Sequence, residues 1–190
     1  MLAKGLAIQK MNPGDAVKVI KEWEKEKVAD RLRLYFFPET LWDRLPETAK
    51  RALISADREY ESPLGLRPSI LGHLEDAVRR VLVQEIVNSF RGYKRGTDAE
   101  DDLSEMLLLW KRKKFREFVV GHFGDADGNW LVNLEDDLWL LHRLYNKKKH
   151  LHTMSPSEFE TDVKEQYRKF LGIGCRGVLP RLMAMRPLSS

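Results

Sequence analysis

The segment from Leu134 to His152 constrains the fold more than any other part of the chain, because its apolar side chains recur at helical spacing. The apolar positions lie three or four residues apart and are Leu134, Leu138, Leu141 and Tyr145. Such spacing places side chains on one face of an α-helix, which must be covered by other elements. Asn133 can cap this helix, and acidic residues follow where the helix dipole favours anions. The segment therefore predicts an amphipathic helix with its Leu face in a core.

The same periodicity predicts helices along most of the chain and no β-strand. We expect helices at 15–35, 47–61, 68–90, 98–123 and 156–171, and short helical segments at 40–45 and 178–185. Thr97 or Asp98 is expected to cap the fourth of these, and the Gly- and Asp-rich stretch 122–130 indicates a connection. The sequence therefore predicts an all-α bundle of about six to seven helices without a sheet.

The length of 190 residues, with 43% hydrophobic and 33% charged residues, is typical of one globular domain. We divide the chain into an N-terminal arm (1–14), a helical domain (15–171) and a C-terminal short helix and tail (172–190). The single cysteine, Cys175, excludes an intrachain disulfide and a cysteine-based zinc site. No apolar run approaches the roughly 20 residues that span a bilayer, so we expect a cytoplasmic protein without membrane contacts. The net charge of +4 permits an anionic partner without requiring one.

A basic cluster lies at the end of the Leu134 to His152 helix. Arg143, Asn146 and His150 occupy positions i, i+3 and i+7, which places them on one helical face, roughly 10 Å along the axis. A guanidinium binds two phosphate oxygens at once, an imidazole titrates near neutral pH, and an amide orients either group. This face is therefore a candidate phosphate site. The alternative is a solvated helix end, whose cations complement the negative end of the helix dipole.

The spacing of Arg143 and His150 resembles the R-x4-6-H signature of the HEPN superfamily, here on a late amphipathic helix of a helical chain. The resemblance covers this helix closely, and the rest of the chain shares helical layout, length and basic charge. It implies a HEPN-like helical bundle acting as a metal-independent endoribonuclease, in which two protomers of a homodimer form a cleft for RNA. Many members are toxins or defence effectors, which implies a cognate antitoxin or a larger effector protein as a partner.

The resemblance also implies roles for the three residues. His150 would be the general acid or base, Arg143 would stabilise charge on the phosphorus, and Asn146 would orient Arg143 or the phosphate. No metal ion or cofactor is expected, because the nucleophile belongs to the RNA. A different alignment, on Asn146 and His150, places Tyr145 at the arginine position and makes the domain non-catalytic. Arg143 lies only about 20° from His150 around an ideal helix, whereas Tyr145 continues the Leu face.

Two runs of cations provide the remaining candidate RNA contacts. The first is Lys147, Lys148 and Lys149, between Asn146 and His150. The second is Lys111, Arg112, Lys113 and Lys114, flanked by Trp110 and Phe115. Cations beside aromatic rings can follow a nucleic-acid backbone, but charge runs are more often solvated faces over core aromatics. The alternatives to a ribonuclease are therefore a non-catalytic interaction module and a basic nucleic-acid-binding domain.

Overall fold

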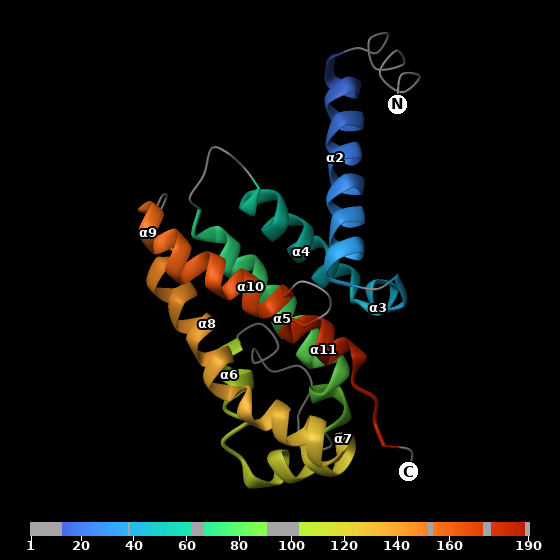
Figure 1. The fold of residues 1–190 in the computed structure, drawn as a ribbon, viewed down its shortest axis with the longest axis vertical. Helices are drawn as coiled ribbons and strands as arrows, with labels where there is room; N and C mark the ends of the chain where they lie inside the picture. The colour runs from blue at the N-terminus through green and yellow to red at the C-terminus, as the bar shows by residue number, and fades with distance from the viewer. Residues whose placement is uncertain are drawn as a thin grey trace.

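The computed structural model describes residues 13–37, 39–61, 67–90, 103–151, 154–172 and 176–188, and within these ranges it contains helices and no strand. In chain order the elements are α2 (Pro13–Tyr35), α3 (Glu39–Arg44), α4 (Glu47–Tyr60), α5 (Ser69–Glu85), the 3-10 turn η1 (Val87–Ser89), α6 (Leu103–Leu107), α7 (Lys113–Asn133), α8 (Glu135–Lys148), α9 (Pro156–Glu158), the π-helical turn η3 (Phe159–Lys164), α10 (Glu165–Leu171) and α11 (Val178–Ala184). The predicted all-α fold is therefore confirmed. Figure 1 shows the helices gathered around α5, with α2 extending away from the others.

α5 occupies the centre because its apolar stripe is wide enough to meet helices on several sides. Its buried apolar side chains are Ile70, Leu71, Leu74, Ala77, Val78, Val81 and Leu82. The helices α4, α8, α10 and α11 all pack against α5. A helix was expected to continue to Phe90, but α5 ends at Glu85 and η1 follows. Through α5, the helix that carries the candidate site is held against the rest of the fold.

The region between α6 and α8 differs from the sequence-based prediction. One helix was expected to reach 123, but the chain is interrupted between α6 and α7. Within α7, Gly124 has a φ of 81° and a ψ of 170°, which lie outside the helical region and which glycine adopts without steric cost, so α7 consists of two helical segments, 113–123 and 125–133, that meet at a kink. A Cβ on Gly128 would lie 2.5 Å from Cα of Val120, so the two halves pack closely. The helix that was expected to reach 123 does end there, and the connection predicted for 122–130 is confined to Gly124, because the residues that follow it are helical.

The predicted cap of α8 was also wrong. Asn133 is the last residue of α7, and Leu134 is the N-cap of α8, without a side-chain hydrogen bond to the first turn. The chain therefore passes from α7 into α8 with no room for a separate capping residue. The predicted cap at Thr97 or Asp98, and His152 at the end of the motif segment, lie outside the described residues.

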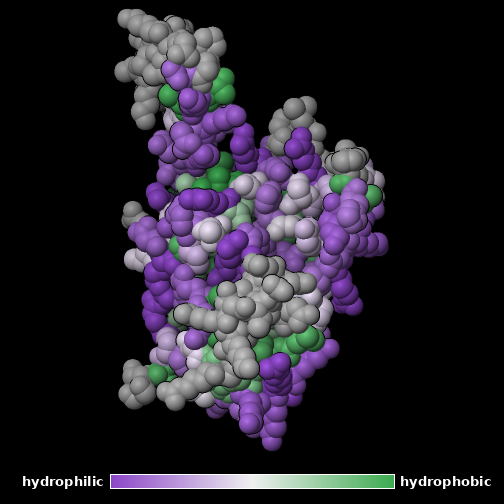
Figure 2. Space-filling model, turned by 180° about the vertical axis from the view of Figure 1, so that it is seen from behind, coloured by the Kyte–Doolittle hydropathy of each residue, from purple (hydrophilic) through white to green (hydrophobic). Residues whose placement is uncertain are grey.

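Only the C-terminal part of α2 buries an apolar face. Leu32 is fully buried, whereas Val17 is 49% exposed and Tyr35 is 52% exposed. Figure 1 shows the reason, because the N-terminal half of α2 extends beyond α4 and no described helix covers it. Figure 2 shows hydrophobic surface near this end of α2, at the top of the view. The helix begins at Pro13, slightly before the predicted Asp15, and residues 1–12 lie outside the described ranges.

The last helical region begins at a well-capped turn. The Ser155 hydroxyl accepts from the backbone N–H of Glu158, and the Glu158 carboxylate accepts from the backbone N–H of Ser155. This reciprocal pair is a capping box, which satisfies N–H groups that the first turn leaves without partners. The chain then runs through α9, η3 and α10 to Leu171 without a break. None of the described helices combines the length and apolar character that crossing a bilayer requires.

Candidate functional site

α8 presents its Leu face to the core, as its sequence predicts. Leu134 is 3% exposed, and Leu138 and Leu141 are fully buried. The ring of Tyr145 packs on Gly72 of α5, where a Cβ would lie 2.8 Å from Cε2 of the tyrosine. Glycine at this position lets α5 and α8 approach each other. The Tyr145 ring therefore packs against the core. It does not lie on the solvent-exposed side of α8, which is the open face of this helix.

Arg143 and His150 both lie in solvent at the C-terminal end of α8. Arg143 is within the helix, and His150 is in the turn that follows Lys148. Both side chains are exposed, and neither forms a hydrogen bond or ion pair with another described residue. A guanidinium and an imidazole without internal partners keep all their hydrogen-bonding capacity for a ligand.

Asn146, the third predicted residue, belongs to a chain of hydrogen bonds that begins in the interior. Glu75 Oε1 of α5 lies 2.8 Å from His142 Nδ1, and His142 Nε2 lies 2.7 Å from Asn146 Nδ2. Asn146 Oδ1 then accepts from Lys149 Nζ at 3.0 Å. The side chains of His142 and Glu75 are only 12% and 9% exposed, so the inner part of the chain is shielded from water. The amide of Asn146 thus connects a buried pair to the surface.

This chain fixes the proton positions on His142. An amide NH2 group donates, so His142 Nε2 accepts from Asn146, and His142 Nδ1–H donates to Glu75. The amide oxygen of Asn146 faces Lys149. A proton on Nε2 would set two donors against each other and turn the amide over. Glu75 and His142 are therefore positioning residues for Asn146.

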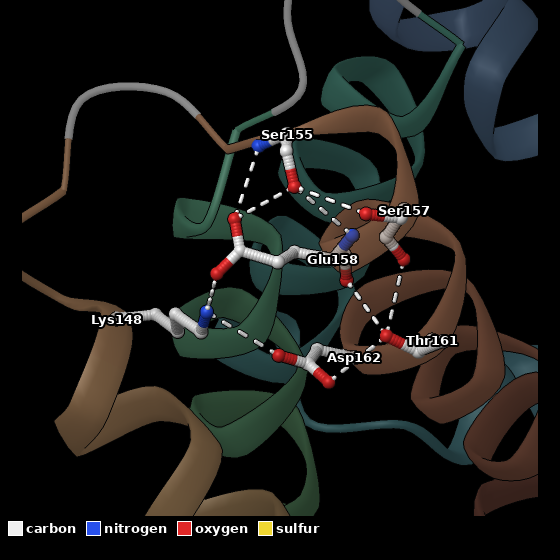
Figure 3. A network of polar contacts seen from close by, with 6 residues as sticks. All are labelled: Lys148, Ser155, Ser157, Glu158, Thr161 and Asp162. Atoms are coloured by element: carbon white, nitrogen blue, oxygen red, sulfur yellow. Dashed lines mark hydrogen bonds and ion pairs between the residues drawn. The ribbon is translucent and has the colours of Figure 1, made fainter.

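The three lysines after Asn146 separate into two kinds. Lys147 and Lys149 are exposed, but Lys148 is only 3% exposed. Figure 3 shows the Lys148 ammonium between Glu158 and Asp162, at 2.5 Å and 3.4 Å from their carboxylate oxygens. The structure therefore places Lys148 in an internal ion-pair network rather than on the basic surface.

Glu158 is the centre of that network (Figure 3). Its carboxylate accepts from Lys148 and also from the hydroxyl and the backbone N–H of Ser155. These hydrogen bonds, the one from Lys148 first, lower the pKa of Glu158 from 4.5 to about 2. The end of α8 is in this way joined to the start of α9.

The second basic run lies beside α8. Residues 111–114 are all exposed. Lys111 Nζ is 5.6 Å from the ring centroid of Trp139, and the same ring meets His142 edge-on at 5.9 Å. Trp139 lies four residues before Arg143, about 6 Å along the axis. The flanking rings of Trp110 and Phe115 are fully buried, as the core alternative predicts. The structure thus brings Lys111 next to the helix that carries Arg143, although the two runs are far apart in sequence.

Glu75, His142 and Trp139 were not among the candidate residues from the sequence. Glu75 carries a usable signal, because it interrupts the apolar stripe of α5 between Leu74 and Val78, and a carboxylate there needs an internal partner. His142 lies one turn before Asn146, which also favours a contact. The pairing of His142 with Glu75 spans 67 residues and depends on how α5 and α8 pack, which no local pattern specifies.

Known proteins do not extend the HEPN resemblance. No protein-family model matches the chain, and neither a curated protein nor a solved structure is significantly similar to it. In the part of the chain that the structure describes, no three His, Cys, Asp or Glu side chains are grouped as ligands for a metal ion. The HEPN assignment therefore remains a proposal that rests on the residues of α8.

Proposed function

We propose that this chain is a metal-independent endoribonuclease of the HEPN type that cleaves RNA on the open face of α8. The observation that carries the proposal is the exposure of Arg143 and His150 at the same helix end, with no partner among the described residues. Cations that a protein does not neutralise itself remain available to RNA phosphates. The amide of Asn146, fixed by His142, stands between them in the sequence and supports the same use.

The proposed reaction uses the RNA itself as nucleophile. One His150 removes the proton of a ribose 2′-hydroxyl, and the 2′-oxygen attacks the adjacent phosphorus. The bond between phosphorus and the 5′-oxygen breaks, and a second imidazole protonates that oxygen. The products are a 2′,3′-cyclic phosphate and a 5′-hydroxyl. Arg143 binds the phosphate oxygens, whose negative charge increases in the transition state.

A second copy of the chain supplies the second imidazole in this proposal. Base and acid act on opposite sides of the phosphorus, and His142 is already held by Glu75 and Asn146. Two copies with their α8 faces opposed would place one His150 on each side of the RNA. Leu151 is 44% exposed beside His150 and offers apolar surface for such a contact.

The basic surface next to α8 gives the RNA strand a path. From Arg143 the path leads to Trp139 and then to Lys111, whose ammonium contacts the Trp139 ring. Exposed cations at 112–114 and at Lys147 and Lys149 extend it. Lys148 takes no part, because its ammonium is paired with Glu158. Phosphate contacts of this kind position RNA without reading its sequence.

The test is cleavage of RNA by the purified chain in EDTA, with the product ends examined for a 2′,3′-cyclic phosphate. His150→Ala is expected to reduce the rate by about 10² to 10⁴, the usual contribution of a general acid or base. Arg143→Ala is expected to reduce it by about 10² to 10³, because transition-state charge loses its partner. Asn146→Ala should cause a smaller loss.

Matched controls remove the same groups elsewhere. Arg116 is an exposed arginine on α7, and His73 is a partly exposed histidine on α5. Arg116→Ala and His73→Ala should cleave at the wild-type rate. Cleavage that survives both Arg143→Ala and His150→Ala, or that requires a divalent cation, would contradict the proposal.

A second candidate function is RNA binding without cleavage, which the contact of Lys111 with Trp139 favours. In this case affinity should fall steeply with salt and should depend on Lys111 and Lys114 rather than on His150. Intact RNA after incubation with the wild type, together with unchanged binding by His150→Ala, would favour this candidate.

A further inference from the structure

A pocket of about 490 Å³ lies between α2, α4 and α10, and no residue of α8 lines it. Figure 1 shows α2 beside α4. Four of its lining residues are aromatic: Tyr35, Phe36, Tyr60 and Tyr167. Small-molecule sites are typically mostly apolar pockets of roughly 300–1,000 Å³ with a few polar groups. The pocket therefore has the size and lining of a ligand site.

The inner aromatic wall is rigid. The rings of Tyr60 and Tyr167 are stacked, with their centroids 4.0 Å apart and their planes 6° apart. Phe36 meets Tyr167 edge-on at 6.1 Å. The hydroxyl of Tyr167 donates to Asp57, which fixes the ring from its far end. Tyr35 is half exposed and completes the aromatic lining near solvent. A planar ring can make stacked or edge-on contacts with such a lining at little entropic cost.

One cation of the pocket, Arg168, has no partner among the described residues. Asp57 is 1% exposed and accepts a hydrogen bond from Arg31 Nε at 2.8 Å, so the carboxylate of Asp57 already has an internal partner. The same guanidinium also lies near Glu61, with Nη1 3.6 Å from its carboxylate, so two carboxylates of the pocket share this one positive charge. Arg168 also lines the pocket, is exposed, and has no hydrogen bond or ion pair to another described residue. A ligand that fits would therefore place an anionic group on Arg168.

We propose that this pocket binds a small planar aromatic molecule that carries one anionic group, either a carboxylate or a phosphate monoester. Its ring lies among Tyr35, Phe36 and Tyr60, and its anionic group pairs with Arg168. The guanidinium binds both kinds of anion in the same bidentate way. The proposal is independent of the ribonuclease proposal, because the two sites share no residue.

The test is isothermal titration of the full chain with 2-naphthoate. Two analogues each lack one feature: 2-naphthalenemethanol has the ring without the charge, and cyclohexanecarboxylate has the charge without an aromatic ring. We expect 2-naphthoate to bind about tenfold more tightly than either analogue, the typical worth of one charge-assisted or aromatic contact. A parallel titration with 5′-AMP distinguishes the two anions. Tighter binding of 5′-AMP assigns the pocket to phosphate monoesters, and tighter binding of 2-naphthoate assigns it to carboxylates.

Two variants at exposed positions locate the binding without threatening the fold. Arg168→Gln should weaken 2-naphthoate about tenfold and leave 2-naphthalenemethanol unchanged. Tyr35→Ser should weaken both. Arg51→Gln, at an exposed arginine elsewhere on α4, is the control and should bind as the wild type does. No heat with 2-naphthoate at millimolar concentration, or equal affinity in all variants, would overturn the proposal. A Tyr35→Ser protein that changes from dimer to monomer in sedimentation would overturn it too, because the pocket would then be covered by a second copy.

Discussion

The charged groups around Asp57 have hydrogen-bond partners inside the protein, whereas Arg143 and His150 on the open face of α8 have none among the described residues. The carboxylate of Asp57 accepts from both Arg31 and Tyr167, and the three residues join α2, α4 and α10. Arg143 and His150 on α8 have no partner among the described residues. Burying a charge is costly unless hydrogen bonds replace its water, so Asp57 needs its internal partners. Water solvates the exposed groups on α8, so these groups need no internal hydrogen-bond partners.

This difference separates stability from the proposed activity. A charge with internal partners contributes to holding helices together, whereas a charge without them contributes little to stability and remains free for a ligand. Substitutions in the Asp57 cluster should therefore lower the free energy of unfolding, and substitutions on the open face should not.

The largest effect on stability is expected for Asp57→Ala. The change leaves Arg31 and Tyr167 without their acceptor, so the free energy of unfolding should fall by about 3 kcal/mol in urea denaturation followed by circular dichroism. Asp136→Ala, at an exposed aspartate of α8 without an internal partner, should change it by less than about 0.5 kcal/mol. RNA cleavage per folded molecule should be unchanged in both. Equal stability of the two variants would remove the distinction between the regions.

A smaller effect, about 2 kcal/mol, is expected for Tyr167→Phe, which removes one hydrogen bond to a charged group. Burial, and then the charge and hydrogen bond of Asp57, raise the pKa of Tyr167 above its usual 10.0. The folded state thus favours the protonated phenol, so this contribution is complete below pH 10.0 and is lost as the pH rises further. The wild type should lose stability at alkaline pH more steeply than Tyr167→Phe.

Tyr35→Phe is the matched control for that slope, because it removes the hydroxyl of an exposed tyrosine. It should retain the wild-type dependence of unfolding free energy on alkaline pH. If the unfolding free energies of Tyr167→Phe and Tyr35→Phe depend on alkaline pH to the same extent, then the buried phenol of Tyr167 does not contribute to the pH dependence of stability.

The smallest effect is expected for Glu158, whose side chain is 46% exposed. Its pKa of about 2 lies below the usual 4.5, so its contribution to stability is complete above pH 4.5 and is lost as the pH falls towards 2. Glu158→Gln should therefore flatten this acid limb of the stability profile. Arg143→Ala should keep the wild-type acid limb, and an altered limb in that variant would show that the open face is not electrostatically separate.

The helices that were predicted correctly are those that the local spacing of apolar residues is sufficient to identify. The stripe of α5 and the Leu face of α8 need only spacing to be recognised. The helical segment 125–133 was missed because glycines and aspartates favour turns when taken alone, whereas the break at Gly124 does lie within the predicted connection. The segment is held by Gly128 lying against Val120 and by the hydrogen bond from Trp110 Nε1 to the Leu131 carbonyl, at 3.0 Å. Both contacts join residues that sequence patterns do not relate.

The candidate site, like the fold, was predictable only in part. Arg143 and His150 lie in solvent at the end of α8, which the spacing of the Leu face implies. Lys148 shows where the analysis of a charge run was incomplete: it lies seven residues after Leu141 and so continues the inward face, as its burial shows. The positioning pair of Glu75 and His142 could not be predicted, because it depends on the register between α5 and α8.

The bonds of Glu158 have a consequence for the geometry of His150. Lys148 and Ser155 are both bonded to this one carboxylate, so the backbone between them forms a closed ring that contains His150. Adding or deleting a residue within the ring would break it or move the imidazole relative to Arg143. The reach of the His150 imidazole is thus limited by the number of residues between Lys148 and Ser155. This limit is a matter of chain length rather than of side-chain chemistry.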